Sequence, residues 1–191
     1  MTAVGELDFL GDEGLQRRLV RWSFALLGAG GVVGAGLWLA GTFDVAGEMG
    51  ALRLGGIPPT LVWLVLLALV SVGVLPVHEL VHGALFRLFG GPGTRVTFGA
   101  QAGMLYAGCP GLVLPRGRFC VVLAGPVALL SGALLAVPAE FGLPCLGYVA
   151  FVLHLAGCSG DLLALCRVLG DARCTHCEDT ERGVRLLARA G

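Results

Sequence analysis

Long apolar blocks alternate with shorter polar segments along the whole chain. The four blocks cover residues 19–40, 60–89, 119–137 and 146–168. Each is long enough for a helix that crosses the hydrocarbon core of a bilayer, which takes about 17–25 residues. The pattern predicts an all-α membrane protein with about four transmembrane helices, built as one membrane-embedded domain over residues 1–191 and ending in a polar tail at 169–191.

The first block has a second interpretation, because a cleaved signal peptide also places an apolar run near the start of a chain. The segment before this block is acidic and contains Glu6, Asp8, Asp12 and Glu13. Signal peptides instead begin with a positively charged region and have an apolar core of only about 7–15 residues. We therefore expect residues 19–40 to be a transmembrane helix.

Composition supports a membrane protein and excludes one class of partner. Hydrophobic residues make up 56% of the chain and charged residues 14%, whereas about 25% of a soluble domain is charged. The formal net charge is +0, lysine is absent from the sequence, and no basic patch typical of nucleic-acid binding is visible. We expect a lipid bilayer around the chain and no nucleic-acid partner; the sequence carries no signal for an oligomeric state.

The arginines are distributed unevenly between the polar segments, and this predicts an orientation. Most lie before the first block, between the second and third, or after the fourth: Arg17, Arg18, Arg21, Arg87, Arg95, Arg116, Arg118, Arg173, Arg182, Arg185 and Arg189. The other two connecting segments contain Arg53 alone or no arginine. Because cytoplasmic segments carry an excess of arginine, we expect a multi-pass protein of the cell membrane with both termini in the cytoplasm.

The second block contains the motif His78-Glu79-x-x-His82. On a helix, residues four positions apart share a face, so the two imidazoles can bind one divalent ion. Glu79 would then lie beside the ion, where a carboxylate can act as a general base toward water. Histidines and a glutamate that merely hold helices together are the alternative, but an unpaired carboxylate in a transmembrane segment is costly. The motif predicts a Zn²⁺ site with His78 and His82 as ligands and Glu79 as a catalytic residue.

A catalytic zinc ion needs a third protein ligand, and the fourth block offers His154, Cys158 and Asp161. At about 1.5 Å of rise per residue, His78 lies about 27 Å from the outer end of its block. In a regular helix over the fourth block, Asp161 lies about 23 Å deep and His154 about 12 Å deep. An anionic ligand also offsets part of the charge of the ion. We expect Asp161 to be the third ligand, with His154 as the alternative ligand or as a group that supports the site.

The segment between the second and third blocks predicts a small β-hairpin or an edge strand. Residues 94–98 alternate between polar and apolar, Gly99 and Gly103 punctuate the segment, and residues 104–106 follow. An edge strand beside a metal can align an extended peptide by strand addition. The hydroxyl of Tyr106 can act catalytically by donating to a developing oxyanion, or the side chain is an anchor at the membrane interface.

The polar tail contains Cys174 and Cys177 in a C-x-x-C motif that includes His176. One such half-site does not supply the four ligands of a structural zinc site, so free thiols, metal binding and redox use all remain open. After Asp179, apolar residues mixed with arginines predict a short amphipathic surface helix.

These motifs resemble two families. An H-E-x-x-H motif joined to an aspartate on a later helix resembles the site-two proteases, which are intramembrane zinc metalloproteases. A closer resemblance is to a family of small bacterial membrane proteins regarded as zincin peptidases, a domain of unknown function. That resemblance rests on residues 77–83, Gly103–Ala107 with Cys109-Pro110, 118–126 and 159–162. It implies a zinc-dependent peptidase that uses His78, Glu79, His82 and Asp161.

Two functions fit these observations. The first is a membrane-embedded zinc metalloprotease that hydrolyses peptide bonds of a membrane protein or peptide substrate, within or near the cytoplasmic half of the bilayer. The second is a non-catalytic metal-binding membrane protein that acts as a sensor or scaffold. The presence of Glu79 favours the first, because a structural metal site has no need of a general base.

Overall fold

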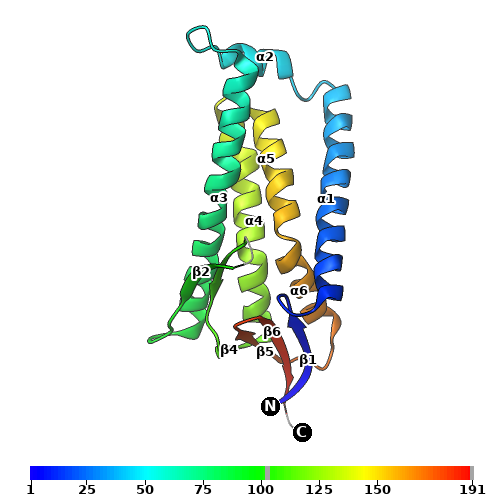
Figure 1. Cartoon of the computed structure of the whole chain (residues 1–191), viewed down its shortest axis with the longest axis vertical. Helices are drawn as coiled ribbons and strands as arrows, with labels where there is room; N and C mark the ends of the chain where they lie inside the picture. The colour runs from blue at the N-terminus through cyan, green and yellow to red at the C-terminus, as the bar shows by residue number, and fades with distance from the viewer. Residues whose placement is uncertain (102–103, 190–191) are drawn as a thin grey trace.

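Four long helical segments run side by side along the long axis of the molecule (Figure 1). The structure is a computed structural model that describes residues 1–101 and 104–189, so Gly103 lies outside the described residues. The segments are α1 (Glu13–Leu39), α3 (Pro59–Gly90), α4 (Arg116–Glu140) and a bent pair made of α5 (Pro144–Gly157) and α6 (Ser159–Gly170). A short helix, α2 (Val45–Ala51), lies at one end of the molecule between α1 and α3.

The four apolar blocks correspond to these four segments. Within the described residues, α1, α3 and α4 are each long and apolar enough to cross a membrane, and the α5–α6 pair is a fourth candidate if it counts as one span. α1 begins earlier than the expected residue 19 because Asp12 caps it. The Asp12 carboxylate accepts a hydrogen bond from the backbone N–H of Leu15 at 3.0 Å, which satisfies one of the free donors of the first turn.

The fourth block is not one regular helix, which corrects the expectation for residues 146–168. α5 and α6 are bent by 55° at Cys158. The backbone N–H of Cys158 is shared between the carbonyl oxygens of His154 at 3.0 Å and Leu155 at 3.2 Å. This mixed bonding is typical of a helix end that tightens into a 3₁₀ turn. The bend therefore redirects the part of the block that carries Asp161.

Two antiparallel sheets lie toward the other end of the molecule from α2 (Figure 1). The smaller is a hairpin of β2 (Thr97–Gln101) and β3 (Met104–Gly108). It lies in the segment for which the sequence predicted a hairpin or an edge strand. The larger has the strand order β1-β6-β5-β4 and consists of β1 (Thr2–Asp8), β4 (Val113–Pro115), β5 (His176–Thr180) and β6 (Gly183–Ala188). The fold is therefore mainly helical with two small antiparallel sheets, and the larger sheet corrects the expected all-α class.

Strand β6 occupies the place of the amphipathic helix expected after Asp179, so that expectation is also wrong. Val184 and Leu186 are buried, whereas Arg185 between them points away and forms an ion pair with Glu178 of β5 at 3.1 Å. A period of two is the pattern of a half-buried strand. The partner on the other side is β1, from the opposite end of the chain, and a local pattern cannot reveal a pairing that distant.

The main core lies between the larger sheet and the ends of the helices nearest to it. Its members include Phe119 and Val122 of α4, Val168 of α6, and Cys177 and Leu186 of the sheet, all buried. This core joins the sheet to α4 and α6. As a result, α6 packs against α4 and shares this buried core with the sheet.

Candidate metal centre

Two histidines of α3 lie in the interior of the helix group. His78 and His82 are one helical turn apart and are buried, with 8% and 7% of their surface exposed. Their Nε2 atoms lie 3.1 Å apart. The uninterrupted helix through this part of α3 brings the two rings to one face, which is the arrangement that the motif requires.

Asp161, in the first turn of α6, joins these histidines. Its Oδ2 atom lies 3.0 Å from Nε2 of His78, and its Oδ1 atom lies 3.3 Å from Nε2 of His82. Asp161 lies just after the bend between α5 and α6, and its carboxylate reaches both rings of α3. His78, His82 and Asp161 thus form one group whose potential ligand atoms all lie within 4.8 Å of one another.

Glu79 lies beside this group and not within it. Its side chain is half-buried, and its carboxylate interacts with the backbone of Ala107 in β3. The hairpin therefore contacts α3 at the motif itself. Within the described residues, Glu79 belongs to neither group of potential metal ligands, and its carboxylate faces β3.

Gly83, directly after the motif, makes the approach of the hairpin possible. A Cβ atom at this position would come within 2.6 Å of the Phe98 ring of β2. A larger residue would push β2 away from α3. The glycine thus sets how closely the hairpin covers the motif.

His154 also contacts His78, but through the other ring nitrogen. Nε2 of His154 lies 3.2 Å from Nδ1 of His78, and Sγ of Cys158 lies 3.5 Å from the same His154 atom. His78, His154 and Cys158 form a second group with potential ligand atoms within 4.8 Å. The depth difference between His154 and the motif was calculated for a regular fourth helix, whereas the chain bends after α5 and His154 contacts His78, in the place of a group that supports the site.

Comparison with known proteins gives one family. The sequence profile of the family described as "Putative zincin peptidase" matches residues 71–174, which is more than half of the chain. The chain belongs to this family. The match contains the motif of α3, the hairpin, and all of α4, α5 and α6. No curated protein and no solved structure matches the chain.

The zincin family implies zinc, and the donor set of this chain fits it. Zinc in a catalytic site takes three protein ligands at about 2.0–2.2 Å in tetrahedral geometry, which places the ligand atoms about 3.3–3.5 Å apart. The atoms of His78, His82 and Asp161 are separated by 3.0–3.3 Å. Two imidazoles and one carboxylate are also ligands that zinc accepts. A small outward movement of the side chains is enough to accommodate the ion.

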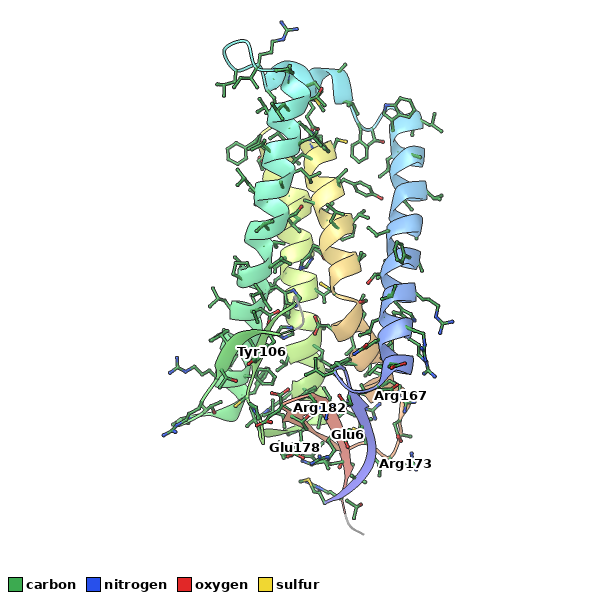
Figure 2. The ribbon with its side chains drawn as sticks, viewed as in Figure 1. Glu6, Tyr106, Arg167, Arg173, Glu178 and Arg182 are labelled. Atoms are coloured by element: carbon green, nitrogen blue, oxygen red, sulfur yellow. The ribbon has the colours of Figure 1, made fainter. Side chains whose placement is uncertain are left out.

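Tyr106 has no comparable place in this zincin. Its ring lies against Gly99, its partner across the hairpin, where a Cβ atom would come within 2.6 Å of the hydroxyl oxygen. The side chain is 43% exposed, and Figure 2 shows it on the hairpin beside α3. In this structure the Tyr106 hydroxyl therefore faces the hairpin and not the ligand group.

The C-x-x-C motif lies in the larger sheet, apart from both groups. The Sγ atoms of Cys174 and Cys177 lie 3.7 Å apart, both residues are buried, and both thiols are free. Burial raises the pKa of the Cys177 thiol, and the neighbouring Cys174 adds to this effect. Over the described part of the chain, these cysteines do not join a group of three potential metal ligands.

Proposed function

We propose that this zincin is a membrane-embedded zinc metalloprotease that cleaves a membrane protein or peptide in the cytoplasmic half of the bilayer. The observation that carries the proposal is the convergence of Nε2 of His78, Nε2 of His82 and the carboxylate of Asp161. All three can act as acceptors, and acceptors brought together in a buried place call for a cation between them.

Each residue near this group has a distinct task. His78, His82 and Asp161 hold the ion, which supplies a Lewis acid that polarises the scissile carbonyl group. Glu79 removes a proton from the attacking water as the new C–O bond forms. It then delivers that proton to the amide nitrogen as the C–N bond breaks, so a single carboxylate serves as base and then as acid.

The hairpin supports a proposal for how the substrate is held. β2 and β3 form a two-stranded sheet against α3, and the backbone of β3 touches Glu79. A helical transmembrane substrate has all its amides bonded internally, so it must unwind before its backbone is accessible. An extended segment can then add to the hairpin as a further strand, which would place its amides next to Glu79.

The setting is proposed from the helices. The long apolar helices favour a bilayer around α1, α3, α4 and the α5–α6 pair. His78 lies about 28 Å along α3 from Pro59, so the site lies deep in the membrane, toward the end that carries the sheets. The arginine distribution favours the cytoplasm for that end.

The test is zinc content and turnover of the purified protein in detergent, with a labelled single-span membrane protein as substrate. Wild type should bind one zinc per chain and cleave. Glu79→Gln should keep the zinc and lose activity by about 100-fold to 10,000-fold, because only proton transfer is removed. Unchanged activity of Glu79→Gln would contradict the mechanism. A zinc-loaded wild type that cleaves nothing, with Glu79→Gln behaving identically, would favour the sensor or scaffold.

A further inference from the structure

His78 uses both of its ring nitrogens. Nε2 faces His82 and Asp161, at 3.1 Å and 3.0 Å. Nδ1 faces His154, whose Nε2 atom lies 3.2 Å away. His154 comes from the last turn of α5, is 5% exposed, and lies outside the H-E-x-x-H motif. The mechanism above does not use it.

The chemistry of imidazole fixes the roles in this pair. A neutral histidine that offers the Nε2 lone pair to a metal carries its proton on Nδ1. That N–H group then needs an acceptor, because an unpaired buried donor is costly. Nε2 of His154 is at hydrogen-bonding distance and becomes an acceptor when His154 carries its own proton on Nδ1.

His82 shows that such support is provided for the second ligand as well. Its ring lies next to the backbone of Val122 in α4. The two ligand histidines are therefore held differently: His82 by a main-chain group, and His78 by a side chain that the sequence could lose. Only the orientation of the His78 ring therefore depends on one particular side chain, that of His154.

We propose that His154 is a positioning residue for the zinc site: it accepts the Nδ1–H of His78 and so directs the Nε2 lone pair of His78 toward His82 and Asp161. The inference rests on the metal site proposed above. His154 acts through His78 and does not itself bind the ion.

The group His78, His154 and Cys158 is the competing ligand set, and burial of charge argues against it. If the ion were bound there, the buried Asp161 carboxylate would remain beside two imidazoles without a metal. If the ion is bound by His78, His82 and Asp161, the groups left over are a neutral imidazole and a neutral thiol. Leaving neutral groups costs far less than leaving a buried carboxylate.

The test measures zinc affinity by competition with a chromophoric chelator in detergent, for His154→Leu and His154→Gln. The leucine variant lacks an acceptor and should bind zinc about 10-fold to 100-fold more weakly, as is usual when a partner of a ligand histidine is lost. The glutamine variant can place Oε1 near the position of Nε2 and should stay within a few-fold of wild type. Thermal unfolding of the metal-free proteins shows whether His154→Leu is folded.

Cys158→Ala is the matched control: it removes a neighbour of both His78 and His154 but keeps the contact between Nδ1 of His78 and Nε2 of His154, so it should weaken zinc binding much less than His154→Leu does. Substituting Co²⁺ for zinc should give a spectrum without a thiolate-to-cobalt band. A thiolate band that disappears in Cys158→Ala would overturn the inference, as would a folded His154→Leu with wild-type affinity or an equal loss in both His154 variants. A wild type without bound metal would instead refute the proposed function, and the inference with it.

Discussion

An acidic side chain lies near each end of the helix group, Glu48 buried and Asp161 half-buried, and the two have different partners. Glu48 of α2 is 4% exposed and accepts hydrogen bonds from Nε1 of Trp63 at 2.7 Å and from the backbone N–H groups of Cys145 and Leu146 at 2.8 Å and 2.9 Å. Asp161 instead faces the imidazole nitrogens of two histidines.

The difference shows how to tell a structural carboxylate from a functional one. The partners of Glu48 can only donate, and two of them belong to the first turn of α5, where N–H groups have no partner within the helix. That carboxylate closes the end of a helix and needs nothing more. The partners of Asp161 are imidazole nitrogens, which can either donate or accept, so this carboxylate and the two rings can also share a cation. Glu48 is buried and Asp161 is half-buried, and the type of partner separates the two residues more clearly than burial does.

Removing Asp161 should have the largest effect on function. We expect Asp161→Ala to weaken zinc binding by more than about 100-fold, which is the upper range for the loss of a ligand's partner, and to abolish turnover. Zinc per chain after dialysis, measured by elemental mass spectrometry, tests this. Glu48→Gln is the control and should keep its zinc. If Asp161→Ala retained metal while Glu48→Gln lost it, the roles assigned to the two carboxylates would be reversed.

Removing Glu48 should have the largest effect on stability. Glu48→Ala leaves three buried donors without an acceptor, so the free energy of unfolding should fall by about 3 kcal/mol or more. Thermal unfolding in detergent measures this, and zinc affinity of the folded fraction should be unchanged. Glu48→Gln keeps one carbonyl acceptor and should lose less. A neutral Glu48→Ala would mean that the cap of α5 does not contribute to stability.

Asp179 of β5 extends the comparison, because its carboxylate is buried and accepts few hydrogen bonds. Its Oδ2 atom accepts a hydrogen bond from the backbone N–H of Cys109 at 2.5 Å. Burial outweighs this bond and raises the pKa of Asp179 to about 6. The folded state therefore holds a proton that the unfolded state releases near pH 4, and the free energy of unfolding should fall as pH rises from about 4 to 6 and then level off.

The decrease should be at most about 3 kcal/mol, from about two pKa units. Asp179→Asn keeps an acceptor for Cys109 and should remove this part of the pH dependence. Unfolding curves for both proteins between pH 4 and 7 measure the difference. Parallel pH profiles for the two proteins would show that the Asp179 carboxylate ionises freely in the folded state.

Tyr106 should show the smallest effect. Because its hydroxyl lies over Gly99, we expect Tyr106→Phe to change kcat by no more than a few-fold, with zinc content intact. Loss of a group that stabilises an oxyanion typically costs about 100-fold to 1,000-fold. A loss of that size in a steady-state assay would restore the catalytic interpretation of this side chain and imply that the hairpin moves on substrate binding.

Local spacing predicted much of the fold and of the candidate site, and distant pairing accounts for what it did not predict. The four apolar blocks, the hairpin and the shared face of His78 and His82 follow from patterns within about 30 residues. The bend at Cys158 is flanked by Gly157 and the Ser159-Gly160 pair, which favour a kink, but the depth calculation for His154 assumed a regular helix through this point. The larger sheet joins Thr2 to Ala188, which no local period can indicate.

The larger sheet also restricts how many times the chain can cross any membrane around the helices. β1 and β6 are hydrogen-bonded neighbours, so the chain must be on one side of the bilayer before α1 and after α6, and the number of crossings between them must be even. β4, which lies between α3 and α4 in the chain, belongs to the same sheet. The chain therefore leaves the side of the sheet and returns to it twice, once before β4 and once after it. α1 and α3 make one such excursion. The other consists of α4 and the bent α5–α6 pair, so if α4 crosses a membrane, that pair has to bring the chain back to the side of the sheet.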